Sequence, residues 1–288
     1  MPEAPEIRVL ADQLNKRLEG ATIHKLYTPL RYTWELTYNN NVEINSRVLG
    51  VESYGKELYI HLENDHQIYI HLMMAGRISF DVPRINIFGG FLTDDIGKIE
   101  VDNYLDGLKL SKMHSIIEYT EAGAEGNAEI KRIFINDKTV LMKVNHYHKS
   151  DFVPSKAPDI FHTSVKQLLE FMNKRKRKNV TGFLMDQNII AGIGNYLKCD
   201  ILYRCKIYPH LSIGELSEAQ KINLAKTMID IPRESYEKGG SCDYMVDGKY
   251  ISPVYNNKNV NQDSLNDAIK REKTKDGRFT YWVPTVQT

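Results

Sequence analysis

Cysteine is scarce in this chain of 288 residues. The three cysteines, Cys199, Cys205 and Cys242, include no CxxC pair, which excludes a disulfide framework and favours a reducing compartment. Long apolar runs are also missing, since a membrane-spanning helix needs about 18 consecutive apolar residues. The first residues lack the basic and apolar regions of a signal peptide. We therefore expect an intracellular protein without a membrane partner.

An excess of charge of either sign is missing as well. Lysine and arginine total 38 against 37 acidic residues, a net charge of +1, which excludes both a polycation and an acidic solvating tail. The two halves differ, however. Residues 1–150 hold 17 basic and 21 acidic side chains (net −4), and residues 151–288 hold 21 and 16 (net +5). The second half is therefore better suited to contact a phosphate backbone.

Hydrophobic periodicity changes along the chain. Apolar residues at helical spacing predict one amphipathic helix over residues 5–18, and short alternating segments then predict an antiparallel sandwich or barrel. The strand segments are 21–28, 41–49, 50–54, 57–63, 66–73, 77–81 and 98–102. Helical periodicity returns after residue 158, with Ser212 or Ser217 as candidate helix caps. An aromatic run at 277–283 predicts half of a β-hairpin.

These patterns predict an α+β fold of several parts. We expect an N-terminal antiparallel β-sandwich domain with an N-terminal helix over residues 1–150. A linker with two prolines follows at 151–158. A helical domain is expected over 159–240, and a region that ends in a β-hairpin over 241–288.

The first residues offer a nucleophile. Removal of Met1 leaves Pro2 with a free secondary amine, which can form an iminium with an aldehyde carbon. Glu3 and Glu6 lie one helical turn apart beside it. Acidic residues at a helix start also cap the helix and complement its dipole, so the spacing leaves catalysis and capping open.

Two glycine-containing motifs offer further chemistry. In residues 55–58 (GKEL), Lys56 follows a turn glycine and is either a solvated hairpin residue or a partly buried amine suited to proton transfer. In residues 192–196 (GIGNY), glycines precede a predicted helix. They either form a tight helical corner or let backbone N–H groups, together with the side chain of Asn195, approach a phosphate.

Two other patterns are ambiguous. Residues 174–178 (KRKRK) form either a solvated face or localisation signal, or, with the other bases of this half, part of a phosphate-binding surface. Those other bases are Lys198, Arg204, Arg271, Lys273, Lys275 and Arg278. The pair His146 and His148 has metal-ligand spacing, but no third ligand lies near it in sequence, which favours an ordinary surface.

Taken together, these motifs resemble the formamidopyrimidine-DNA glycosylase and endonuclease VIII (Fpg/Nei) family of base-excision repair enzymes. Residues 1–7 (MPEAPEI) resemble its N-terminal motif, 54–58 (YGKEL) its lysine turn and 71–76 (HLMMAG) its intercalation loop. Residues 184–209 are similar to its helix-two-turns-helix signature, and 277–287 (GRFTYWVPTVQ) to the last hairpin of its zinc finger. The five motifs follow in family order from end to end.

The resemblance implies a bifunctional DNA glycosylase and AP lyase. Pro2 would attack C1′ of the damaged nucleotide and expel the base, Glu3 would handle protons at the sugar, and Lys56 would contact a phosphate and assist strand cleavage. An iminium at C1′ acidifies the C2′ proton, so base excision and strand cleavage by β- and δ-elimination follow from one intermediate.

The resemblance also implies how DNA is held. Asn195 and Arg278 would bind the phosphates around the flipped nucleotide, and Met74 would fill the space that the base leaves. Glu6 and Gly194 would support the site. The expected partner is damaged double-stranded DNA, with bubble and single-stranded DNA as further candidates. The protein is expected to be a monomer that lies with DNA, either in the nucleoid or cytoplasm or in the nucleus.

The chain departs from the family at the zinc finger. Val283 and Val286 occupy the last pair of cysteine positions, and residues 254–266 contain no cysteine for the first pair. A structural zinc site needs about four thiolate or imidazole ligands. We therefore expect no metal and no cofactor, and a zincless finger in which Trp282, Val283 and Val286 pack where the metal would have been.

Two loops bear on the expected substrate preference, residues 105–110 and the segment after Gly240. In residues 105–110, Leu108 and Leu110 stand where many family members place an arginine and an aromatic residue, so only Met74 is a clear void-filling residue. The short loop after Gly240, together with Ala4 and Ile7, resembles the endonuclease VIII branch. This favours oxidised pyrimidines, hydantoins and ring-opened purines as substrates.

Two other functions are compatible with the sequence. The first is a damaged-DNA-binding protein on the same fold that does not cut, against which the intact trio of Pro2, Glu3 and Lys56 argues. The second is RNA binding through residues 174–178, which a comparison of duplex DNA and RNA at several salt concentrations separates from DNA binding.

Elemental analysis tests the zincless finger. The purified protein is expected to contain far less than one zinc per chain, because too few ligands are available at the hairpin. Stoichiometric zinc that survives dialysis against a chelator would refute this prediction.

Overall fold

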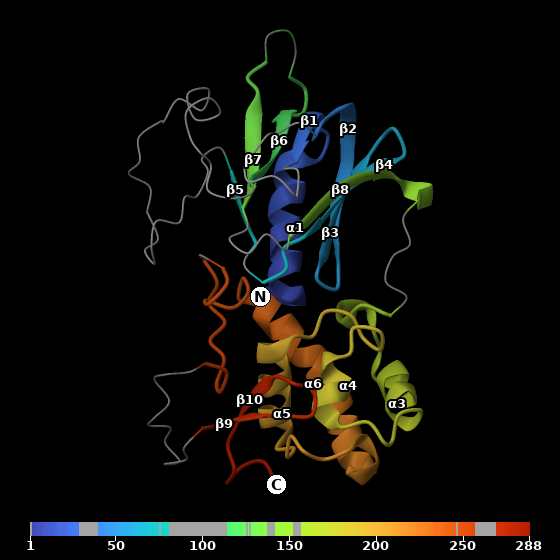
Figure 1. Cartoon of the computed structure of the whole chain (residues 1–288), viewed down its shortest axis with the longest axis vertical. Coiled ribbons are helices and arrows are strands. Elements are labelled where there is room, and N and C mark those ends of the chain that lie inside the picture. Colours follow the sequence, from blue (N-terminus) through green and yellow to red (C-terminus); the bar gives the residue numbers. More distant parts are fainter. Residues whose placement is uncertain are drawn as a thin grey trace. The chain divides into compact units, whose positions relative to one another are not determined.

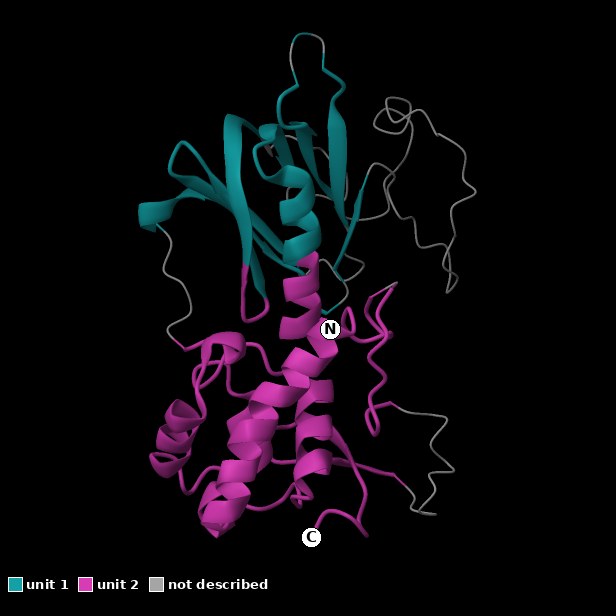
Figure 2. Cartoon of the chain, turned by 180° about the vertical axis from the view of Figure 1, so that it is seen from behind, with its two compact units in different colours: residues 1, 11–52, 57–152 teal, residues 2–10, 53–56, 153–288 magenta. Residues whose placement is uncertain are grey.

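The computed structural model describes most of the chain in two compact units. The described residues are 2–28, 40–74, 76–80, 114–124, 126, 128–136, 142–151, 157–245, 247–256 and 269–288. The first unit is formed within residues 11–52 and 57–152, and the second within residues 2–10, 53–56 and 153–288 (Figure 2). Helix α1 (Ala4–Leu18) is therefore divided, because its first seven residues group with the second unit.

The first unit is an antiparallel sheet with the second part of α1 lying against it (Figure 1). Hydrogen bonds join its strands in the order β5-β7-β6-β1-β2-β3-β4-β8. The strands are β1 (Thr22–Thr28), β2 (Asn40–Tyr54), β3 (Glu57–Leu62), β4 (His66–His71), β5 (Arg77–Phe80), β6 (His114–Thr120), β7 (Lys131–Asn136) and β8 (Lys143–His148), and the short 3-10 helix η1 (Lys149–Asp151) follows.

Strand β2 connects the two halves of this sheet. Its first part pairs with β1, from Asn40 to Arg47, and its other neighbour is β3. On β3 and β4, Leu58 lies opposite Ile70 and Ile60 opposite Ile68. All four side chains are buried, so alternate residues of these strands form one apolar face, as the period-two pattern predicts.

The second unit is mainly helical (Figure 1). It contains η2 (Ile160–His162), α3 (Val165–Asn173), α4 (Val180–Met185), α5 (Asn195–Cys205), η3 (Ile213–Glu215), α6 (Glu218–Glu237) and a hairpin of β9 (Lys270–Lys273) and β10 (Phe279–Trp282). Ser212 caps η3 and Ser217 caps α6, each through a capping box, so both candidate caps are used. The core includes Phe183, Tyr196 and Met228.

Two turns connect α4 to α5. The side chain of Gln187 holds them, since its Oε1 accepts the N–H of Gly192 at 3.0 Å and its Nε2 donates to the carbonyl of Ile193 at 2.8 Å. Ala191 is fixed from the other side, because its carbonyl accepts the N–H of Ile160 at 3.0 Å. These bonds set the position from which α5 begins.

The hairpin is supported by apolar packing at the end of β10. Val283 is buried against Cys199 and Val254, and Val286 packs on the same cluster. The ring of Trp282 lies 5.1 Å from that of Tyr208. The packing expected for Trp282, Val283 and Val286 is therefore present, while the absence of zinc stays a prediction.

The α+β fold, with an antiparallel sheet followed by a helical unit, confirms the predicted fold class. The segments 41–49 and 50–54 form one strand rather than two, and the segment 98–102 lies outside the described residues. The compact units differ from the predicted division of the chain in that residues 2–10 and 53–56 group with the helices. Among the described residues, no helix is long and apolar enough to cross a membrane.

Candidate active site

Glu6 fixes the start of α1. Its Oε2 accepts the backbone N–H of Glu3 at 2.8 Å, which is a capping contact within the helix. Its Oε1 accepts the hydroxyl of Tyr196 at 2.8 Å and the N–H of Ser241 at 2.8 Å. Glu6 is fully buried. One carboxylate therefore joins the first turn of α1 to α5 and to the segment after α6.

Glu3 lies at the N-terminal end of α5. Its Oε2 accepts the N–H groups of Gly194 and Leu197 at 2.7 and 3.2 Å, and its Oε1 accepts that of Tyr196 at 3.0 Å. These are the N–H groups that a helix cannot satisfy itself, and the helix dipole favours an anion there. The residue is only 2% exposed, so Glu3 acts as a buried cap for α5.

The two glycines before α5 make this approach possible. A Cβ on Gly194 would lie 2.3 Å from both Cδ and Oε1 of Glu3, a distance that no side chain tolerates. Gly192 has a φ of +111°, and a Cβ there would lie 2.7 Å from that of Ala4. The glycine motif is therefore a tight helical corner, and its N–H groups bind the carboxyl group of Glu3 in this structure.

Lys56 reaches the same corner from the turn between β2 and β3. Gly55, with a φ of +58°, forms the turn, and its N–H donates to the carboxylate of Asp159. The Nζ of Lys56 donates to the carbonyl of Ile193 at 2.8 Å, and the residue is 8% exposed. Lys56 is thus a buried amine rather than a solvated hairpin residue, and that carbonyl also accepts Gln187.

The site shifts its titrating groups in opposite directions. Burial raises the pKa of Glu3, an effect that the charge of Lys56 and the three amide donors oppose. Burial lowers the pKa of Lys56; the charge of Glu3 opposes this change, and that of Arg278 adds to it. Burial raises the pKa of Glu6 to about 7, against the hydrogen bond from Ser241. These shifts move the pKa of Glu3 and that of Lys56 toward neutral pH, where each group can both accept and donate a proton.

Pro2 is half-buried and directly precedes Glu3 in the chain. Its place is therefore set by the bonds that hold Glu3, one residue away from the carboxylate that caps α5. The predicted nucleophile, acid and lysine thus belong to one unit, although Lys56 is 54 positions from Pro2 in the sequence.

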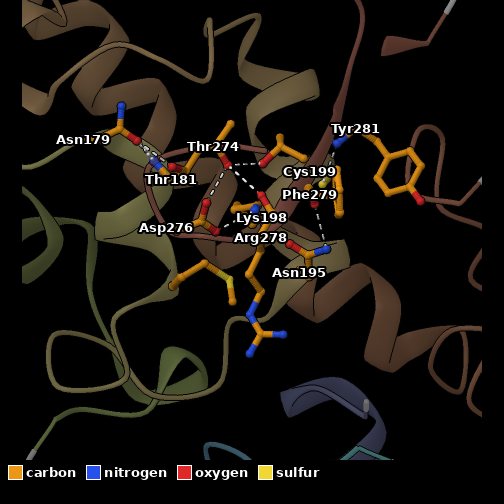
Figure 3. A network of polar contacts seen from close by, with 12 residues as sticks. Asn179, Thr181, Asn195, Lys198, Cys199, Thr274, Asp276, Arg278, Phe279 and Tyr281 are labelled. Atoms are coloured by element: carbon orange, nitrogen blue, oxygen red, sulfur yellow. Dashed lines mark hydrogen bonds and ion pairs between the residues drawn. The ribbon is translucent and has the colours of Figure 1, made fainter. Parts of the chain in front are cut away.

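Asn195 and Arg278 both lie where α5 contacts the hairpin (Figure 3). Asn195 is the first residue of α5, and its Nδ2 donates to the carbonyl of Phe279 at 3.0 Å. Its buried Oδ1 has no hydrogen-bond partner among the described residues. The side chain of Arg278 is exposed and extends away from the polar contacts around it (Figure 3).

The remaining candidates are placed as follows. Met74 belongs to the other unit, where it lies 48% exposed in the turn after β4. Leu108 and Leu110 lie outside the described residues. Lys198, one of the bases named for a possible phosphate-binding surface, is instead fully buried in an ion pair with Asp276, so it does not belong to such a surface.

The histidine pair has a third neighbour that sequence spacing could not reveal. Because β4 pairs with β8, His66 lies opposite His148, and its ring stacks on that of His146 at 4.7 Å and 20°. Nearly parallel rings do not direct their nitrogen atoms at one point. Among the described residues, no group of three histidine, cysteine or acidic side chains could hold a metal ion.

Several supporting residues were not predicted. Tyr196 binds Glu6 through its hydroxyl, Asp159 holds the turn of Lys56, and Ser241 binds Glu6 through its N–H. Their partners are 104 or more positions away in sequence, so no local pattern signals them. Only the tyrosine lies inside a quoted motif.

Comparison with known proteins identifies the class of protein. The model of the formamidopyrimidine-DNA glycosylase N-terminal domain matches residues 1–109, and the model of the formamidopyrimidine-DNA glycosylase H2TH (helix-two-turns-helix) domain matches residues 156–245. With the fold, these matches define a DNA-repair glycosylase architecture. The chain belongs to the formamidopyrimidine-DNA glycosylase and endonuclease VIII family, as the resemblance of its motifs implies.

Individual relatives are similar to this chain over all or nearly all of their length. Endonuclease 8 of Escherichia coli O127:H6 is 28% identical, with all of both chains covered. Formamidopyrimidine-DNA glycosylase of Mycoplasmopsis pulmonis is 25% identical over all of this chain and 98% of its own. The structure of Lactococcus lactis Fpg in complex with DNA containing an oxidised pyrimidine has the same fold, with a TM-score of 0.76, 20% identity and full coverage of both chains.

A substitution of Gly194 tests the contact between Glu3 and α5. Gly194→Ala is expected to lower the free energy of unfolding by about 3 kcal/mol, because a displaced carboxylate leaves buried N–H groups unsatisfied. Gly182→Ala in α4 is the matched control, since its Cβ would meet only Lys178 at 3.8 Å. The control should be neutral or about 1 kcal/mol more stable. Equal denaturation midpoints for Gly194→Ala and wild type would contradict the contact.

The pH dependence of stability tests the burial of Glu6. Because its pKa is raised from 4.5 to about 7, the folded state holds a proton that the unfolded state has lost. Stability is therefore highest below pH 4.5 as far as Glu6 is concerned, and about 3 kcal/mol is lost as the pH rises through 7. In urea denaturation between pH 5 and 8, Glu6→Gln should make the free energy of unfolding depend less on pH. Asp200→Asn, a substitution at another buried acid, removes a separate contribution to this dependence. Identical slopes for wild type and Glu6→Gln would show that Glu6 does not titrate as stated.

Proposed function

We propose that this protein is a bifunctional DNA glycosylase and AP lyase that excises oxidised bases through a Schiff base at Pro2. One observation carries the proposal. The residue next to Pro2, Glu3, is a buried carboxylate whose pKa is raised, and it lies in the field of Lys56, a buried amine whose pKa is lowered. A purely structural cap has no need of a buried amine beside it.

The proposed reaction begins at the N-terminal amine. With Met1 removed, the nitrogen of Pro2 attacks C1′, and the bond between C1′ and the damaged base breaks. A carboxyl group with a raised pKa can hold a proton near neutral pH, so Glu3 is suited to protonate the sugar as its ring opens. The product of this step is an iminium between Pro2 and C1′, the Schiff base.

Strand cleavage follows from the same intermediate. The iminium withdraws electrons from C2′, and a base removes a C2′ proton while the bond from C3′ to the phosphate oxygen breaks. A second elimination releases the 5′ phosphate. Lys56, an amine with a lowered pKa, is suited to contact a phosphate and to assist these proton transfers.

Three side chains are proposed to contact the damaged DNA. Asn195 and Arg278 bind phosphates around the flipped nucleotide, and Met74, which is exposed in its turn, enters the space that the base leaves. Glu6 and Gly194 keep Glu3 in place. The partner is damaged duplex DNA, bound by a monomer, with bubble and single-stranded DNA as further substrates to test.

The preferred lesions are proposed to be oxidised pyrimidines, hydantoins and ring-opened purines. The segment between Gly240 and Tyr250 is short and closed on itself, because the N–H of Tyr250 donates to Gly240 and its carbonyl accepts Cys242. A short segment here resembles the endonuclease VIII branch, and relatives named Endonuclease 8 cover the whole chain. Duplexes that each carry one defined lesion rank the substrates.

Trapping with borohydride tests the Pro2 mechanism, because this reagent reduces an iminium to a stable amine. The processed chain should form a covalent adduct with duplex DNA that carries an abasic site, whereas the same chain with Met1 retained should form none. Pro2→Gly should give a reduced yield. Glu3→Gln should slow base excision by about 100-fold or more, the usual contribution of a general acid.

The outcomes separate the candidates. An adduct from the chain that retains Met1, or a full yield of adduct from Pro2→Gly, would indicate that another amine, such as that of Lys56, is the nucleophile. Tight binding of damaged duplex with neither excision nor adduct would instead indicate the non-catalytic DNA-binding protein. Intact mass of each sample establishes whether Met1 is present.

A further inference from the structure

The hairpin of β9 and β10 needs anchors outside itself, because two strands of four residues are at best marginally stable alone. Apolar packing of Val283 anchors the end of β10. The opposite end, the turn between the strands, carries no comparable apolar cluster in the described residues and is held by polar contacts (Figure 3). These contacts link the turn to α5.

The central contact of the turn is a buried ion pair. The Nζ of Lys198 on α5 lies 2.8 Å from Oδ2 of Asp276, with side-chain exposures of 0% and 3%. Oδ1 of Asp276 accepts the hydroxyl of Thr274, which also contacts the hydroxyl of Thr280 at 2.6 Å. Burial raises the pKa of Asp276, but the hydrogen bonds from Lys198 and Thr274 outweigh it and hold that pKa below its ordinary value. The carboxylate of Asp276 is therefore ionised, and further hydrogen bonds satisfy it, as burial requires.

The same contacts hold the backbone of Arg278. Its N–H is a donor to Asp276, and its carbonyl accepts the N–H of Thr274 at 3.0 Å and the hydroxyl of Thr274 at 3.2 Å. The next carbonyl, that of Phe279, accepts Asn195. The side chain of Arg278 is exposed and takes no part in these contacts (Figure 3). The backbone is thus fixed while the guanidinium stays available to a ligand.

We propose that Lys198 and Asp276 are positioning residues for Arg278. They fix the turn of the hairpin on α5, so that the guanidinium is presented to a phosphate of the damaged strand at the level of Asn195. Neither residue touches DNA. This inference rests on the proposed function, in which Arg278 contacts DNA.

Binding to duplex DNA with a stable abasic-site analogue tests the proposal. Replacing a buried ion pair by apolar residues of similar size is often neutral for stability, so Lys198→Met/Asp276→Leu should unfold near the wild-type temperature. Its affinity should be about tenfold weaker, the scale of one charged contact. The slope of log Kd against log salt should fall by up to about 0.9, as for one lost phosphate contact.

Two further variants separate positioning from simple stability. Arg278→Gln should produce the same loss of affinity and slope, and adding it to Lys198→Met/Asp276→Leu should cause no further loss, because a misplaced guanidinium and a missing one are equivalent. Lys221→Met is the control. Its side chain is also buried, although its ion-pair partner on α6, Glu218, is exposed, and the variant should leave the slope unchanged.

Several results would overturn the proposal. The first is an additive loss of affinity in the combined variant. The others are a slope of log Kd against log salt that is unchanged from wild type in Lys198→Met/Asp276→Leu or in Arg278→Gln. If the double variant fails to fold, Lys198→Met/Asp276→Asn also removes both charges but keeps the size of residue 276 and one acceptor, and it should show the same loss of slope. A wild-type protein that binds with this pattern but neither excises bases nor forms an adduct would support the positioning role and refute the proposed function.

Discussion

The carboxylate of Glu3 occupies the N-terminal end of α5 and accepts three backbone N–H groups there. Much of the surrounding geometry follows from this contact. Because the carboxylate fills the space beside residue 194, that residue has to be glycine, and residue 192 adopts a φ that favours glycine next to Ala4. The first residues and the helical corner therefore hold each other in place, and the turn of Lys56 joins them at the carbonyl of Ile193.

The sequence left open whether Glu3 and Glu6 cap helix α1 or take part in catalysis, and the structure shows that they have different contacts. Glu6 takes the capping contact within α1, where it accepts the N–H of Glu3. This leaves the carboxylate of Glu3 directed at another helix and close enough to Lys56 for each to affect the pKa of the other. Capping and the proposed catalysis are therefore compatible, because the hydrogen bonds that stabilise the fold also hold the carboxyl group of Glu3 in place.

Periodicity predicted the element types because burial repeats locally along α1, β3 and β4. It could not predict contacts between distant residues. Lys198 counted as a surface cation in the sequence, since its partner Asp276 is 78 positions away, and His66 was missed beside His146 for the same reason. The proximity of Glu3 to residue 194 was implied only by the family resemblance. That resemblance rests on the order of five motifs along the chain, and composition and spacing alone do not assign a role to these motifs.

The division of the chain into compact units has a consequence for recombination. Residues 2–10 and 53–56 group with the helices although they precede the predicted linker at 151–158. A chimaera joined at that linker would therefore place one parent's Glu3, Glu6 and Lys56 on the other parent's helical corner, where even one added methyl group at residue 194 has no room. The modular boundary of this protein is not a single point in the sequence, so exchange between relatives has to carry these two short segments together with residues 153–288.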